Sequence, residues 1–307
     1  NKIWAKNTQS LEFSASIFGI KFNGKFSYVY SNYEFEKAFA KKTFTNEIVS
    51  FEANSNKKDT MFWNKIRPIP LTLEENTDYI KKDSVHTVRN SKKYLDSIDK
   101  KDNKFKFLSP ITGYSWRNST QKKSFRYDGL LNLSSLSFNT VQGWNLDSGF
   151  SFRDWKNQEE KGKSTYISTK FNYGFSDDRL RVTGDYYHRF NNQNYASLSV
   201  FGGTKVNQFN PEEPITSFIN TVSTLFFKDN YMKLYNKEFA GATYGQDVGN
   251  NFYLRGTVEY QQRKPLFNTT DQAFIKTDDV YSSNNPLLPD DNLTPAFEQH
   301  HLTKAAV

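Results

Sequence analysis

The stretch YISTKFNYGFSDDRLRVTGDYYHRF, residues 166–190, decides the fold because largely apolar and largely polar positions alternate along it. In its first half one set of alternate positions is largely apolar: Ile167, Thr169, Phe171, Tyr173 and Phe175. The intervening set is largely polar: Tyr166, Ser168, Lys170, Asn172 and Gly174. After the turn at residues 176–178 the alternation resumes as far as Phe190. A period of two residues predicts two β-strands joined by a short turn.

An apolar face opposite a polar face fits two architectures. In a soluble β-sandwich the apolar face packs in the core and the polar face meets water. In a membrane-spanning barrel the apolar face meets lipid and the polar face lines a wet lumen. Each strand has about ten residues, which suits a tilted crossing of a bilayer. Aromatic residues such as Trp155, Phe175 and Phe190 stand near the strand ends. These features favour the barrel.

Similar alternation predicts strands elsewhere. They lie at residues 11–30 with a bend at Gly19, near residues 45–51, at 144–152, 195–201 and 251–260, and in the closing HHLTKAAV. The predicted fold class is therefore all-β. We expect a partial transmembrane antiparallel β-barrel with an N-terminal β segment and one or two inserted helices.

The segment FWNKIRPIPLT, residues 62–72, predicts the start of a helix. Pro68 and Pro70 each disfavour helical backbone at the preceding residue, so they keep the chain extended. Thr72 is a good N-cap, and Glu75 three residues later completes a capping box. A polar helix is therefore expected from about residue 73 to residue 100, with a break near Asn90.

A further helix is expected to interrupt the strands near residues 214–239. Apolar residues recur there at helical spacing: Phe218, Ile219, Val222, Leu225 and Phe226. The chain then divides into three parts. Residues 1–64 form a periplasmic or lumen-facing β segment, residues 65–124 form the proline-capped polar helix with a connector, and residues 125–307 form the incomplete set of barrel strands.

Composition narrows the function. The 307 residues include no cysteine, which excludes disulfides, zinc–thiolate sites and thiol nucleophiles. The net charge is +8, but basic residues are dispersed among acidic ones, so nucleic acid is not an expected partner. No metalloprotease, esterase or phosphate-loop motif occurs, and the four histidines do not form a converging ligand set. The sequence predicts a protein that is not an enzyme and has no cofactor or metal.

Three segments resemble a known family: TNEIVSFEANSNKKDTMFWNKIRPIPLTLEENTDYIKKDSV, KFLSPITGYSWRNS and LSSLSFNTVQGWNL. They are similar to large outer-membrane proteins of Bacteroidota, in which a carboxypeptidase-regulatory-like β-sandwich precedes a β-barrel domain of unknown function. The resemblance covers about residues 44–302, and its most specific pieces are RPIPL at 67–71 and FNTV at 138–141. It implies the outer membrane of a Gram-negative bacterium as the location. It offers no catalytic residues to carry over.

The expected function is therefore transport, export or a structural role in the envelope, performed by an internal piece of a longer barrel protein. The partners expected are outer-membrane lipid and other envelope proteins. Five polar-face residues are candidates to face the lumen: Lys170, Arg181, Asp185, Arg189 and Arg255. The alternative is a soluble or surface-exposed β-rich protein that binds glycans through its aromatic residues, and this alternative predicts solubility without detergent.

Overall fold

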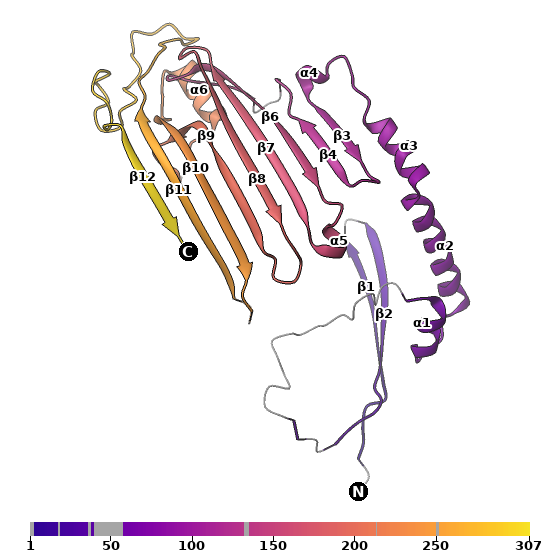
Figure 1. Ribbon diagram of the computed structural model, residues 1–307. Helices are drawn as coiled ribbons and strands as arrows, with labels where there is room; N and C mark the ends of the chain where they lie inside the picture. The colour runs from indigo at the N-terminus through magenta and orange to yellow at the C-terminus, as the bar shows by residue number, and fades with distance from the viewer. Residues whose placement is uncertain are drawn as a thin grey trace. The chain divides into compact units, whose positions relative to one another are not determined.

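A computed structural model of the chain describes residues 3–17, 19–35, 38–39, 58–131, 135–212, 214–249 and 252–307 (Figure 1). The chain forms two compact units, Asn1–Val85 and His86–Val307. The strand expected near residues 45–51 lies outside the described residues. Among the described residues, no helix combines the length and the apolar composition that crossing a membrane requires.

The first unit contains a β-hairpin. Strands β1 (Thr8–Ile17) and β2 (Ile20–Val29) pair antiparallel, and Gly19 has a positive φ of 82° between them. The rings of Phe13 and Phe26 stack across the two strands at 5.7 Å. The position expected to be a bend is therefore a hairpin turn. The short helix α1 (Thr60–Ile66), which the sequence analysis did not predict, precedes the two prolines.

The helix start after the prolines has the expected cap. Helix α2 (Leu73–Asn90) begins just after Thr72. The backbone N–H of Thr72 donates to Glu75 Oε2 at 2.8 Å, and the N–H of Glu75 donates to Thr72 Oγ1 at 3.2 Å. This reciprocal pair of hydrogen bonds is a capping box. Ser91 separates α2 from α3 (Lys92–Asp102), at the break expected near Asn90.

The second unit is built on a ten-stranded antiparallel sheet with the order β12-β11-β10-β9-β8-β7-β6-β4-β3, and β5 also pairs with β6. The strands are β3 (Tyr114–Asn118), β4 (Lys123–Tyr127), β5 (Leu136–Asn139), β6 (Gly143–Asp154), β7 (Ser164–Gly174), β8 (Arg179–Arg189), β9 (Ser197–Gln208), β10 (Leu234–Asp247), β11 (Tyr253–Pro265) and β12 (His300–Ala306). The short helices are α4 (Ser109–Thr112) and α5 (Gln158–Lys161). The described strands form an open sheet with β3 and β12 at its edges, and they do not close into a barrel.

Cross-strand register gives the sheet two distinct faces. Asp185 of β8 is aligned with Ser168 of β7 and with Phe201 of β9. Phe201 is aligned with Gly241 of β10, which is aligned with Glu259 of β11. Residues aligned in this way point to the same side of a sheet, and the next residue on each strand points to the other side. We call the face that carries these five residues the inner face and the opposite one the outer face.

Helix α6 (Ser217–Phe227) is fixed beside β5 at one end of the sheet. The side chain of Asn220 donates to the carbonyl of Phe138 at 3.1 Å and accepts from the N–H of Met232 at 3.0 Å. The N–H of Phe138 donates to Thr221 Oγ1 at 2.9 Å. Asn220 and Phe138 are both buried. These contacts tie helix, strand and following loop together, and we call residues 135–142, 217–234 and 266–285 the β5–α6 cluster.

The cluster also contains the small apolar core of the unit. Val141, Met232 and Leu234 are buried together. Asn284 reaches them from a distant loop: it accepts from the N–H of Leu234 at 2.8 Å and donates to the carbonyl of Leu266 at 2.6 Å. A buried amide that satisfies backbone groups avoids the cost of about 1–3 kcal/mol for each polar group left without a partner. Polar contacts therefore stabilise this core together with apolar packing.

Two boundaries differ from the sequence-based expectation. The inserted helix expected near residues 214–239 ends at Phe227, and residues from Leu234 onward already belong to β10. Pairing with β9 and β11 on both sides overrides the weak helical pattern there. The sheet also begins before residue 125, since β3 lies in the segment expected to be a connector.

Candidate functional site

All five candidate lumen-facing residues fall on the inner face. Asp185 lies in the row described above, and Lys170 is aligned with Thr183 two positions away on the same face of β8. Arg189 and Arg255 lie in a second row, joined through Ser197 of β9 and Gly245 of β10. Arg181, four positions before Asp185 on β8, has the same orientation by strand alternation. The sequence thus identified one continuous polar face, although it did not separate its buried members from its exposed ones.

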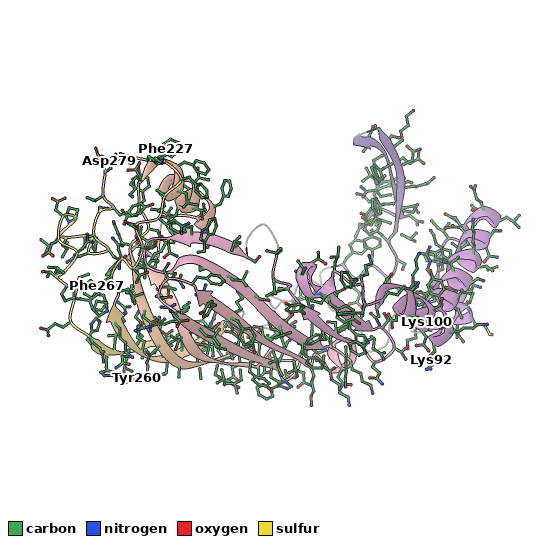
Figure 2. All side chains as sticks on the ribbon, turned by 90° about the horizontal axis from the view of Figure 1, so that it is seen from above. Lys92, Lys100, Phe227, Tyr260, Phe267 and Asp279 are labelled. Carbon is green, nitrogen blue, oxygen red and sulfur yellow. The ribbon has the colours of Figure 1, made fainter. Side chains whose placement is uncertain are left out.

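The outer face is apolar and exposed. Its exposed large residues come from six consecutive strands: Phe150, Ile167, Leu180, Val182, Tyr186, Val200, Tyr244, Leu254, Val258 and Tyr260. Figure 2 shows Tyr260 projecting from the convex side of the curved sheet, away from α6. A soluble monomer rarely exposes a contiguous apolar patch of this extent.

On the inner face Lys170, Asp185 and Arg255 are exposed, but other charged side chains are well covered. Lys237 Nζ lies 2.5 Å from Glu259 Oε1, and these two side chains are 12% and 17% exposed. Lys237 and Lys205 are aligned on neighbouring strands, and their Nζ atoms lie 4.6 and 5.2 Å from the centre of the Phe239 ring. Lys205, Lys237 and Glu259 were not among the residues predicted from the sequence to form a site. Phe201 and Phe239 lie on the same face as these three charged residues. The alternation of polar and apolar residues is therefore not visible in the sequence of this part of the sheet.

Arg181 is the most deeply buried cation of this face. It is 2% exposed, its Nη2 lies 2.5 Å from Asp177 Oδ2, and its Nε donates to Asn236 Oδ1 at 3.0 Å. Its Nη1 and the other oxygen of Asp177 have no hydrogen-bond partner. The sequence predicts that Arg181 faces a wet lumen, whereas the structure places it inside the protein, where Asp177 and Asn236 hold most of its guanidinium.

A cavity of about 440 Å³ lies between this inner face and the β5–α6 cluster. Lys170, Arg181 and Lys205 line it from the sheet. Asn139 and Ser217 line it from the cluster. The site therefore combines three cationic side chains and the carboxylate of Asp147 with uncharged polar groups and the edge of an apolar core.

The family of unknown function DUF5686 has a C-terminal domain whose model matches residues 108–307. The chain belongs to this family. The match includes every strand of the large sheet, helix α6 and the cavity. No curated protein and no solved structure matches the chain.

Within this DUF5686 domain, the segment FNTV at residues 138–141 is mostly buried and forms hydrogen bonds to a distant loop. Phe138, Thr140 and Val141 are each 1% exposed. Thr140 Oγ1 donates to Asn268 Oδ1 at 2.6 Å, and the carbonyl of Val141 accepts from Thr269 Oγ1 at 2.7 Å. These contacts join β5 to a loop more than a hundred residues later in the chain. The structure thus gives FNTV a packing role.

Two groups of the DUF5686 cluster have shifted pKa values. Burial lowers the pKa of Lys233 to about 8, although its Nζ donates to Ser282 Oγ at 2.6 Å. Burial and, to a smaller extent, Asp271 raise the pKa of Tyr281 to about 12. The hydroxyl of Tyr281 contacts the carbonyl oxygen of Thr224 at 2.8 Å. Both groups lie in the loops of the cluster, so their titration reports on its packing.

Metal-binding side chains do not converge in the part of the domain that the structure describes: no group of three or more His, Asp, Glu or Cys residues is close enough to hold an ion. His300 and His301, which the sequence places on opposite faces of a strand, have different partners. His301 Nδ1 lies 2.6 Å from the hydroxyl of Tyr260, whereas His300 Nδ1 lies 2.9 Å from the carbonyl of Glu298.

Proposed function

We propose that this chain is part of an outer-membrane β-barrel of a Gram-negative bacterium and has a non-enzymatic role in transport, export or envelope structure. The proposal rests on where the sheet places its side chains: charged side chains are covered on the inner face, while large apolar side chains are exposed on the outer face. Buried Arg181 and the covered pair of Lys237 and Glu259 lie on the inner face, while Val258 and Leu180 are exposed on the outer face at 58% and 62%. Lipid around the sheet and a polar lumen inside it give each face the solvent that suits it.

Strand length supports the same proposal. The central strands β6 to β11 contain between 11 and 14 residues. A strand of about 9–11 residues is long enough to cross the hydrocarbon core of a bilayer when tilted. The usual strand in a soluble protein has about 5–6 residues. All neighbouring pairs are antiparallel and are joined in chain order from β6 to β11, which is the connectivity of an up-and-down barrel.

The open edges at β3 and β12 fit the proposal if further strands of the same barrel pair with them. An unpaired edge in contact with lipid leaves backbone N–H and C=O groups without partners at a cost of several kcal/mol each. The resemblance to Bacteroidota proteins with a preceding carboxypeptidase-regulatory-like sandwich is in keeping with a larger protein. Outer-membrane lipid and neighbouring envelope proteins are the partners that the proposal implies.

The alternative is a soluble or surface-exposed glycan-binding protein, and the exposed aromatics of the outer face favour it. Tyr186, Tyr244 and Tyr260 present their rings there. These aromatics, however, are mixed with exposed Val182, Val258 and Leu254, which give a carbohydrate no hydrogen bonds. The aliphatic content of the outer face therefore favours lipid over glycan.

Fractionation of the full-length protein from its native cells tests the proposal. We expect it to stay with the outer membrane after a carbonate wash and to migrate differently on a gel with and without boiling, since a closed barrel resists unfolding by detergent at low temperature. Conductance measurements would then address transport. Release into the soluble fraction without a heat-dependent shift would overturn the barrel, and glycan arrays would become the relevant assay.

A further inference from the structure

The cavity between the inner face and the β5–α6 cluster has an excess of unpaired donors. Lys170 and Lys205 both line it. Within the described residues neither Nζ has a carboxylate within ion-pair distance or a hydrogen-bond acceptor, and Lys205 contacts only the ring of Phe239 as a cation. Both lysines are exposed to solvent, and two ammonium groups that line one cavity repel each other, so an anion between them would lower the energy of both.

Several acceptors of the cavity already have hydrogen-bond partners. Asn139 Nδ2 donates to Gln142 Oε1 at 3.2 Å, and Gln142 Nε2 donates to Asn172 Oδ1 at 2.6 Å. Asn172 Nδ2 in turn donates to Asp147 Oδ1 at 3.0 Å. This chain of amides ends at Asp147, the one carboxylate among the described residues of the lining, and Asp147 also attracts Lys170. The described lining therefore has three cations and one anion, and its net charge is positive.

Arg181 adds a donor that is fixed in position. Its side chain is 1% exposed and is held by Asp177 and Asn236, yet Nη1 has no partner and the residue lines the cavity. A buried guanidinium N–H without an acceptor is costly, so an acceptor atom that reached Nη1 would be favoured. The planar fork of arginine suits the oxygens of a carboxylate or a phosphate.

Helix α6 also favours an anion in the cavity. Ser217, its first residue, lines the cavity, and the cap Thr216 Oγ1 accepts only the N–H of Ile219. The first N–H groups of a helix lack intrahelical partners, and the helix dipole places partial positive charge at this end. The helix therefore adds to the attraction that the three cationic side chains exert on an anion.

We propose that this cavity binds a small solute through a carboxylate or phosphate group, with Lys170, Lys205 and Arg181 as its charged contacts. The volume of about 440 Å³ has room for a small organic molecule. The role of such a site in passage through a lumen rests on the proposed function, since only in a barrel does the inner face line a channel. Binding itself does not depend on passage and can be measured separately.

The test uses the full-length protein purified in detergent in a chloride buffer, with calorimetric titration of inorganic phosphate in one arm and of sodium acetate in the other. We expect saturable binding in at least one arm, and the tighter arm identifies the anionic group. Lys205→Gln should weaken it about tenfold or more, because a charge-assisted hydrogen bond is worth at least that factor. The control Arg255→Gln removes an equal charge from the inner face outside the cavity and should leave binding unchanged.

The outcomes separate this proposal from that of the barrel. No saturable binding in either arm by protein that still shows a heat-dependent gel shift overturns the anion site and leaves the barrel standing. Equal loss in Lys205→Gln and Arg255→Gln also overturns it, because it would mean a diffuse charge effect. Loss of binding in Lys205→Gln alone, with an unchanged gel shift, supports the site. Lys170→Gln serves as a second variant if Lys205→Gln does not fold.

Discussion

Val258 and Glu259 are neighbours on β11, yet their exposures are the reverse of what their chemistry favours in water. Val258 is 58% exposed, whereas the carboxylate side chain of Glu259 is 17% exposed and lies 2.5 Å from the ammonium of Lys237. Adjacent residues of a strand point to opposite faces. At this step of the chain the apolar side chain is therefore on the exposed face of the sheet and the charged side chain on the covered one.

Val258→Lys should discriminate between lipid and water at the outer face. A lysine on the lipid-facing side of a barrel near the middle of the bilayer destabilises it by about 2–4 kcal/mol. The same change at an exposed position in water is usually worth less than about 0.5 kcal/mol in either direction. Urea unfolding of the full-length protein in lipid vesicles measures the difference.

Val280→Lys is the matched control for this change. Val280 is 85% exposed, and it lies in the long segment between β11 and β12. We expect no measurable loss of stability from the control. Equal effects of Val258→Lys and Val280→Lys would show that the outer face is not in contact with lipid.

Single cysteines provide a second test, because the chain has none of its own. A cysteine at Val182, on the outer face, should be protected from a membrane-impermeant maleimide in isolated outer membranes and should react after denaturation. A cysteine at Asp185, on the inner face of the same strand, should react in the same membranes. Rapid labelling of Val182→Cys in intact membranes would contradict the assignment of the two faces.

Much of the sheet could be predicted from the sequence because its strands alternate strictly. The hairpin of β7 and β8 follows the alternation from residue 166 to residue 190 almost unchanged. Strand β10 was not predicted, since Leu234, Tyr235 and Asn236 are all buried and no two-residue period is visible at its start. When both faces of a strand are covered, the local pattern that identifies it disappears.

The candidate site was only partly predictable for a related reason. Strand phase is local information, so it correctly placed Lys170 and Arg255 on one face. The burial of Arg181 depends on Asn236, which is 55 residues away in the chain. Asparagines such as Asn220 and Asn284 indicate loops in a sequence, and only tertiary contacts show that they satisfy the backbone of a buried cluster.

Breaking the pair of Lys237 and Glu259 should destabilise the domain. Glu259→Gln leaves Lys237 without its counter-charge and close to Lys205, and the pair is well covered but not fully buried. We expect a loss of about 1–3 kcal/mol, between the values for surface and buried pairs. Chemical unfolding in detergent checks this.

The double variant Lys237→Met with Glu259→Met is the control for the lost pair. Removing both charges avoids leaving one of them buried and unpaired, so it should cost less than Glu259→Gln alone. A larger loss in the double variant than in the single one would show that the two charges do not act as a pair.

Lys233 should make stability depend on pH in a defined window. Its pKa is about 8 in the folded protein, below the ordinary value of 10.5 that it has when unfolded. Between these two values the unfolded chain binds more protons, so the free energy of unfolding rises as pH increases from about 8 to about 10.5. Below pH 8 the full cost of burying a charged lysine is present. Because the side chain is partly exposed, we expect an effect of at most about 1–2 kcal/mol.

Lys233→Met removes the titrating group and should flatten this part of the stability profile, although losing the hydrogen bond to Ser282 shifts the whole curve downward. Lys163→Met, at an exposed lysine before β7, should keep the slope of the natural protein. Unfolding in detergent at pH 7, 8, 9 and 10 measures the three slopes. If Lys233→Met retained the same slope as the natural protein, another group would have to be responsible, and the burial of Lys233 would not control the pH response of the β5–α6 cluster.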